Sequence, residues 1–68
     1  MVIEVTINGV QTTLESGACV SSLLHNMGYA PSKTAVWVNK HQLLMGDYAA
    51  RVLSPGDEVK IVRLFGGG

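Results

Sequence analysis

The sequence predicts an α+β fold in which a mixed sheet of four to five strands packs on one main helix. Residues 2–7 and 58–65 alternate apolar and polar side chains, which is the period of half-buried strands. Between them, residues 20–27 place apolar side chains at i, i+3, i+4 and i+7, on one helical face. We therefore expect the order strand, strand, helix, strand, short strand, strand, with the helix covering one face of a single sheet.

The first two strands are expected to form a hairpin. Asn8-Gly9 directly follows the first alternating segment, and both residues tolerate positive φ. This dipeptide is the strongest short signal for a two-residue hairpin turn. The partner strand is then predicted over residues 10–14, followed by a loop over 15–18.

The main helix is predicted to run from Val20 to Met27. Gly28 stands where a helix C-terminal glycine belongs, because this position usually adopts a left-handed conformation. Pro31 lies in the segment 30–33, which breaks the helix and crosses over to the next strand.

The second half of the chain is predicted to add shorter elements. Residues 35–38 are β-branched and aromatic, which favours a strand, and residues 39–42 should form a turn. A short strand is expected at 43–44, one helical turn within 47–53, and a turn at 54–57. The first and last strands are among the most apolar, so we expect them side by side in the middle of the sheet, in a β-grasp architecture.

Composition narrows the classes of function. The 68 residues, 47% apolar and 15% charged, are typical of a globular domain, which we place at residues 1–65 with a flexible glycine tail at 66–68. Five basic and five acidic residues balance and are dispersed along the chain, so no nucleic-acid partner is expected. Such a small chain with so few charges is not expected to be an enzyme.

The cysteine and histidine residues bear on cellular location and metal binding. Cys19 is the single cysteine and cannot form an internal disulfide, which favours a reducing, cytoplasmic location. It stands at the predicted helix start, either as a reactive thiol or as a small filler. No apolar run is long enough for a membrane span, and His25 and His41 complete no metal-binding pattern.

The chain given ends in Gly66-Gly67-Gly68, straight after the last predicted strand. Residues without side chains can form a thin peptide that enters an enzyme channel and presents a terminal carboxylate. The alternative is a frayed terminus without a function, as many termini are.

Four segments together carry a family resemblance. They are the Asn8-Gly9 hairpin, the helix over 20–28, residues 35–39, and residues 53–59 leading to the glycine end. In this order and at this length, the chain resembles the ThiS family of sulfur carriers from thiamine biosynthesis. The resemblance covers nearly the whole chain and implies a ubiquitin-like β-grasp fold.

The resemblance also implies a chemistry and its partners. Gly68 would be adenylated with ATP by an E1-like, ThiF-type adenylyltransferase while Gly66 and Gly67 thread the catalytic channel. A persulfide donor would convert Gly68 to a thiocarboxylate, and a ThiG-type thiazole synthase would take the sulfur. The carrier itself would bind no cofactor. Three glycines in place of the usual pair, and Met45-Gly46 in place of a more polar stretch, depart from the family pattern.

A docking surface is expected on the outer face of the sheet. Strand alternation sends Trp37, Lys60 and Val62 to that face, which in ubiquitin-like folds contacts the activating enzyme. The alternative is a tryptophan covered by its own neighbours, without a partner.

Other functions stay open from the sequence. A sulfur carrier could serve molybdopterin, cysteine, homocysteine or specialised-metabolite synthesis. The chain could also be a ubiquitin-like protein modifier, or a binding domain with an idle tail.

Overall fold

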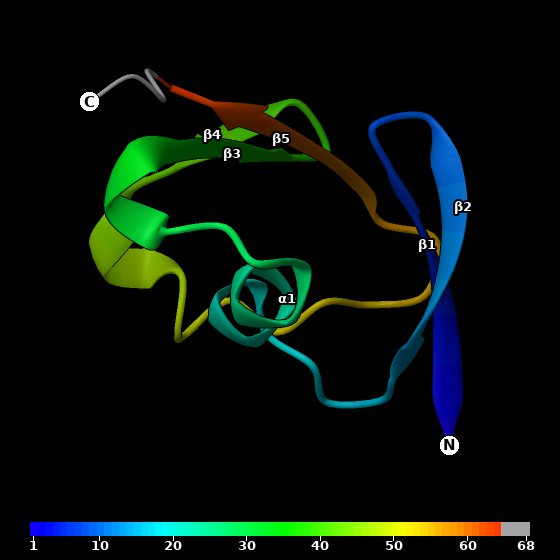
Figure 1. The fold of residues 1–68 in the computed structure, drawn as a ribbon. Helices are drawn as coiled ribbons and strands as arrows, with labels where there is room; N and C mark the ends of the chain where they lie inside the picture. The colour runs from blue at the N-terminus through cyan, green and yellow to red at the C-terminus, as the bar shows by residue number, and fades with distance from the viewer. Residues whose placement is uncertain (65–68) are drawn as a thin grey trace.

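The computed structural model describes residues 1–64, which form one sheet, one α-helix and two short 3-10 helices (Figure 1). The strands are β1 (Val2–Ile7), β2 (Val10–Glu15), β3 (Thr34–Val38), β4 (His41–Leu43) and β5 (Glu58–Arg63). The helices are α1 (Val20–Met27), η1 (Pro31–Lys33) and η2 (Met45–Asp47).

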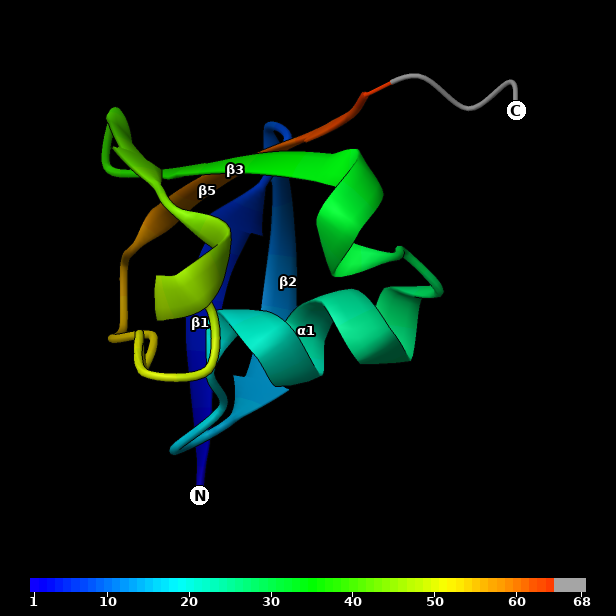
Figure 2. The same cartoon turned by 90° about the vertical axis from the view of Figure 1, so that its left-hand side faces the viewer.

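The sheet has the strand order β2-β1-β5-β3-β4. β1 and β5 pair in parallel in the interior of the sheet, and the other pairs are antiparallel, so the predicted mixed sheet is confirmed. Asn8 and Gly9 have φ values of 52° and 84°, as a hairpin turn of two residues with positive φ requires. The sheet curves around α1, which is seen end-on in Figure 1 and crosses in front of β1 and β2 in Figure 2.

The core lies between the inner face of the sheet and α1. Strand alternation directs every second side chain of β1, β3 and β5 toward the helix, where Val5, Val36 and Val59 are at most 1% exposed. Val20 and Leu24 fill the helix side and are fully buried. The remaining members of this cluster are Ile3, Ile7, Leu23, Val38, Tyr48, Leu53 and Ile61.

The long connection between β4 and β5 is fixed to the start of α1. The buried Tyr48 hydroxyl donates to the Thr34 carbonyl at 2.9 Å, and the Tyr48 carbonyl accepts from the Ser21 amide. The Arg51 carbonyl accepts from the Val20 amide at 3.0 Å. These contacts satisfy amides of the first helical turn, which have no partner within the helix.

Several predicted boundaries were wrong: β2 extends to Glu15, β3 begins at Thr34, and other differences follow along the chain. β4 begins at His41 and not at residue 43, because the turn is confined to Asn39 and Lys40. Both have positive φ, 52° and 71°, which closes a two-residue hairpin and lets pairing resume at once. The helical turn begins as η2 at Met45, before the expected range 47–53, and continues into it, where the Arg51 amide donates to the Asp47 carbonyl at 3.0 Å. β5 ends at Arg63. Phe65 and the predicted glycine tail 66–68 lie outside the described residues.

Candidate functional site

The three side chains predicted on the outer face do lie together there. Trp37 is the register partner of Lys60 across β3 and β5, and Val62 is paired with Ala35 two residues along. Their inward-facing neighbours on β5, Val59 and Ile61, are buried, so Lys60 and Val62 project to the opposite side. Trp37 is half-buried rather than exposed, because it lies between two neighbouring strands.

These side chains line a shallow groove, here called the outer-face groove. Its volume is about 670 Å³, and its walls include Asn8, Gly9 and Lys40 beside the three predicted residues. Trp37 and Val62 give it apolar lining, and Lys40, Lys60 and Glu58 give it charged lining. Apolar side chains combined with charged ones are usual in a transient protein interface.

Asn8 has a second role that its turn signal did not indicate. Its side-chain Oδ1 accepts from the Ile61 amide at 2.7 Å, and its Nδ2 donates to the Ile61 carbonyl at 3.1 Å. The amide side chain thus replaces a peptide group where β1 ends, and it extends the pairing with β5. The register of β1 and β5 contains only Thr6–Glu58 and Ile7–Val59, so this bridge stabilises a short seam.

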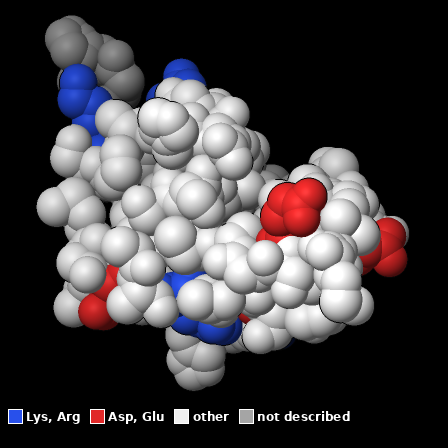
Figure 3. Space-filling view, turned by 90° about the horizontal axis from the view of Figure 1, so that it is seen from below, with Lys and Arg blue, Asp and Glu red and all other residues white. Residues whose placement is uncertain are grey.

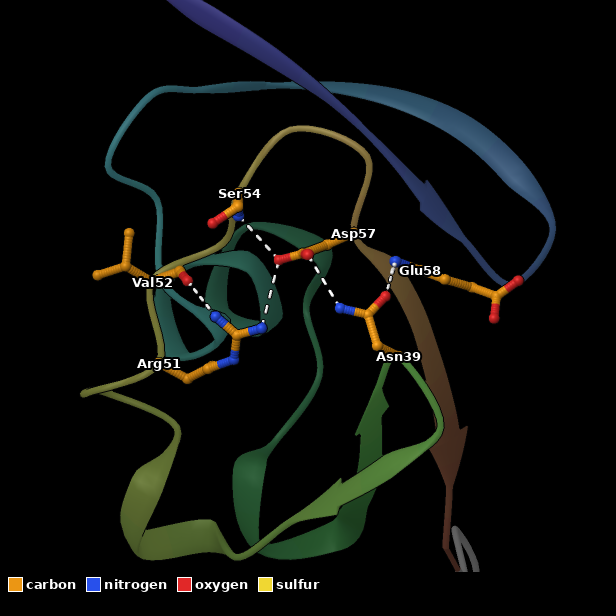
Figure 4. Close-up of polar contacts among 6 residues, drawn as sticks. All are labelled: Asn39, Arg51, Val52, Ser54, Asp57 and Glu58. Atoms are coloured by element: carbon orange, nitrogen blue, oxygen red, sulfur yellow. Dashed lines mark hydrogen bonds and ion pairs between the residues drawn. The ribbon is translucent and has the colours of Figure 1, made fainter.

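A polar network fixes the start of β5 (Figure 4). The buried Asp57 carboxylate accepts from the Ser54 amide at 2.8 Å and from Asn39 Nδ2 at 3.0 Å. Its Oδ2 lies 3.4 Å from Arg51 Nη2 in an ion pair. Asn39 Oδ1 in turn accepts from the Glu58 amide at 3.0 Å. Asp57 is therefore a structural residue that joins the turn before β5 to the β3–β4 hairpin.

The other end of β5 leads toward the predicted reactive glycines. The Leu64 amide donates to the Lys33 carbonyl at 2.8 Å, which ties the chain to η1 beyond the last strand residue. The Arg63 guanidinium lies over the Tyr29 ring, 5.2 Å from its centroid. Gly66, Gly67 and Gly68 themselves are outside the described residues, so their predicted roles stay predictions.

Folding gathers most of the basic side chains that are dispersed in the sequence. Figure 3 shows basic side chains beside the end of the described chain and two acidic patches at the right of the view, together with further acidic and basic patches elsewhere. Glu4 and Glu15 belong to β1 and β2, at one side of the sheet. The basic residues of the other side are Lys33, Lys40, Lys60 and Arg63, on β5 and next to β3. Four of the five basic residues therefore lie on β5 or next to β3, although Glu58 stands at the start of β5 as well.

Cys19 is the N-cap of α1. Its thiol Sγ accepts from the Ser22 amide at 3.5 Å, and Ser22 Oγ accepts from the Cys19 amide at 3.1 Å. Hydrogen bonds from Ser22, first from its backbone and then from its side chain, lower the pKa of the thiol by stabilising the thiolate. Cys19 is half-buried and far in sequence from the other site residues, so a capping function accounts for its position.

Residues 1–64 contain neither a cluster of metal ligands nor a helix that could span a membrane. Among them, no three side chains of His, Cys, Asp or Glu gather closely enough to hold a metal ion. No helix in this part of the chain is both long and apolar enough to cross a bilayer.

Known proteins resemble the chain in sequence and in fold. A thiazole synthase of Magnetococcus marinus is 37% identical over 65 residues, which cover 96% of this chain and 20% of that protein. The chain therefore spans about a fifth of the length of this relative. The crystal structure of the thiamine biosynthesis protein ThiS from Geobacter metallireducens superposes with a TM-score of 0.81 at 26% identity, covering 97% of this chain and all of the other. A solution NMR structure of a thiamine biosynthesis protein from the same organism gives a TM-score of 0.79, again at 26% identity, covering 97% of this chain and 88% of the other.

The sequence profile of the ThiS family matches residues 4–68, which include the three final glycines. The match, the strand order and the similar solved structures agree with the predicted ubiquitin-like β-grasp fold. The chain belongs to the ThiS family.

Proposed function

We propose that this chain is a sulfur carrier for thiamine-thiazole synthesis and that Gly68 carries the sulfur. The observation that supports this most is the ThiS family match, which continues through the glycine run to residue 68. The similar solved structures are named as thiamine biosynthesis proteins, and the curated relative is named as a thiazole synthase. The chain acts as a protein cosubstrate, so catalysis belongs to its partners.

The chemistry begins at a carboxylate, which is a poor electrophile. An activating enzyme transfers AMP from ATP to the Gly68 carboxylate and releases pyrophosphate, so that AMP becomes the leaving group. The terminal sulfur of a persulfide attacks the carbonyl carbon and displaces AMP. A thiol then reduces the remaining S–S bond, which leaves the thiocarboxylate. Covalent activation divides one difficult substitution into easier steps.

Gly66 and Gly67 admit Gly68 to the activating enzyme, because a peptide without side chains fits a narrow channel. The outer-face groove binds the same enzyme through Trp37 and Val62, with Lys60 at the margin. A thiazole synthase then receives the sulfur. A segment similar to this chain occurs within a thiazole synthase, which supports a thiazole synthase as the second partner.

Intact-mass spectrometry tests the proposal directly. The chain ending at Gly68 is incubated with ATP, a persulfide source and the ThiF-type enzyme of its host. We expect a mass gain equal to the exchange of one oxygen for sulfur, located on Gly68 by fragmentation. An unchanged mass, with an enzyme that activates another carrier, would contradict the proposal and favour a modifier or an inert binding domain.

Two tail variants define the role of the glycines. Deletion of Gly68, and Gly67→Trp, should each abolish release of pyrophosphate while the circular dichroism and unfolding curve stay unchanged. Ser16→Ala is a matched control, because Ser16 is exposed in the turn after β2, remote from the tail. Activation that persists in both tail variants would exclude this mechanism.

The outer-face groove is tested separately. Trp37→Ala and Val62→Ala should raise the KM for the carrier roughly tenfold, because aromatic and apolar anchors contribute most of the binding energy in such interfaces. Thr13→Ala, on the outer face of β2, should leave KM unchanged. Equal KM values for all three variants would place the docking surface elsewhere.

A further inference from the structure

A second groove lies where β5 ends, on the side of the sheet that carries α1. It is lined by Gly28, Tyr29, Ala30, Lys33, Thr34 and Arg63, and its volume is about 200 Å³. We call it the tail-root groove. Val62, one residue before Arg63, belongs to the outer-face groove, so the two grooves flank the same strand end from opposite sides.

The walls of the tail-root groove are held by backbone contacts. Gly28 ends α1 with φ of 81°, a left-handed conformation, and the next amide, that of Tyr29, donates to the Leu24 carbonyl at 2.9 Å. Thr34 Oγ1 donates to the Ala30 carbonyl at 2.7 Å. These bonds fix the segment that carries the Tyr29 ring and Lys33. An arrangement set before binding loses less conformational entropy when a partner arrives.

The groove carries two cations without an acidic partner in the described chain. Within residues 1–64, the ion pair present joins Arg51 to Asp57, and Lys33 and Arg63 have none. The Tyr29 ring holds the Arg63 guanidinium at 5.2 Å without neutralising its charge. None of the residues that line the groove is acidic. The groove is therefore a positive site that can accept an anion.

The position of the groove along the chain indicates which anion it meets. Five residues lead from Arg63 to Gly68, and a peptide spans at most about 3.3–3.6 Å per residue, so the distance is below about 18 Å. When Gly68 reaches a reaction centre inside an enzyme, Arg63 is still outside, at the mouth of the channel. The groove therefore faces the enzyme surface around the channel mouth. In an extended chain it is too distant from Gly68 to contact the phosphate of an adenylate.

We propose that the tail-root groove binds carboxylate side chains at the channel mouth of the activating enzyme. This inference rests on the sulfur-carrier function proposed above. A planar guanidinium forms paired hydrogen bonds with a carboxylate, and the Tyr29 ring orients it for that contact. Lys33 supplies a second charge beside it. The outer-face groove supplies apolar contact, and the tail-root groove supplies the charge that aligns the tail with the channel.

Steady-state kinetics of pyrophosphate release by the host's ThiF-type enzyme test the inference, with the carrier as the varied substrate. Lys33→Gln and Arg63→Gln should each raise KM about fivefold at low salt with kcat unchanged, as expected for loss of one charge pair at an interface. Added salt should raise KM for the unchanged carrier and reduce its difference from the variants. Arg63→Lys should recover part of the loss, because it keeps the charge without the planar fork.

Ser16→Glu is the matched control, because it lowers the net charge by the same single unit in the turn after β2. Its KM should equal that of the unchanged carrier. An equal rise in KM for Ser16→Glu would show an effect of total charge and overturn the proposal. Unchanged KM in both glutamine variants, or a lower kcat at constant KM, would also overturn it. An unchanged carrier that is never adenylated would instead contradict the sulfur-carrier function itself.

Discussion

The two ends of β5 use polar residues in different ways. At its start, Asp57 is buried and its carboxylate is occupied by Asn39, Ser54 and Arg51. At its end, Arg63 is exposed and contacts a neutral ring. A polar group whose partners lie within the chain stabilises the fold, and a charge without such a partner is free to bind another molecule. The difference separates structural residues from candidate binding residues along one strand.

The largest expected effect is at the start of β5. Asp57→Ala leaves the Ser54 amide and Asn39 Nδ2 without their acceptor and Arg51 without its ion pair. The free energy of unfolding should fall by about 3 kcal/mol, because several donors around a buried carboxylate lose their acceptor and the partly exposed Arg51 loses its ion pair. Urea unfolding followed by Trp37 fluorescence measures this. A fall of less than about 0.5 kcal/mol would show that the network is dispensable and remove the contrast between the two ends.

The next effect concerns the seam in the middle of the sheet. Asn8→Gly keeps the positive φ of the turn and removes both hydrogen bonds to Ile61. We expect a loss of about 1.5 kcal/mol in the free energy of unfolding, since the Ile61 amide and carbonyl lose their partners. Gly9→Ala is the comparison, because it strains the turn, where φ is 84°, and leaves the bridge intact. An unchanged free energy of unfolding for Asn8→Gly would mean that Asn8 contributes only through the conformation of the turn.

The sequence predicted elements whose determinants are close together in the chain. Asn8-Gly9 and Gly28 located the hairpin and the helix end because each acts through its own φ. The bridge from Asn8 to Ile61 joins residues 53 positions apart, so no local pattern indicates it. Lys33 and Arg63 are likewise brought together by long-range contacts, the pairing of Thr34 with Arg63 and the hydrogen bond from Leu64 to Lys33. The side of the sheet on which Trp37, Lys60 and Val62 lie was predictable because strand alternation determines it, although their exposure depends on neighbouring strands. Their docking function stays a prediction.

Cys19 is an ionisable group that also stabilises the fold, because its thiol caps the start of α1. Its thiol pKa is lowered in the folded chain by hydrogen bonds from Ser22, so the thiolate forms at lower pH than in the unfolded chain. Any stability from this ionisation is complete above the unfolded pKa and is lost as pH falls through the folded one. Iodoacetamide should alkylate the folded chain with a rate profile shifted to lower pH than in urea. Ser22→Ala should move the profile part of the way back, and identical profiles would contradict the capping contact.

The smallest expected effect on stability is at the end of β5, and it completes the comparison. Arg63→Gln should change the free energy of unfolding by less than about 0.5 kcal/mol, because the side chain is exposed and its contact with Tyr29 is weak in water. The same urea titration used for Asp57→Ala provides the measurement. A loss as large as that of Asp57→Ala would make Arg63 structural, and a changed KM in this variant would then report a damaged fold. Unchanged stability together with a raised KM would mean that the fold holds this charge in place without depending on it, which is the property expected of a residue that binds a partner.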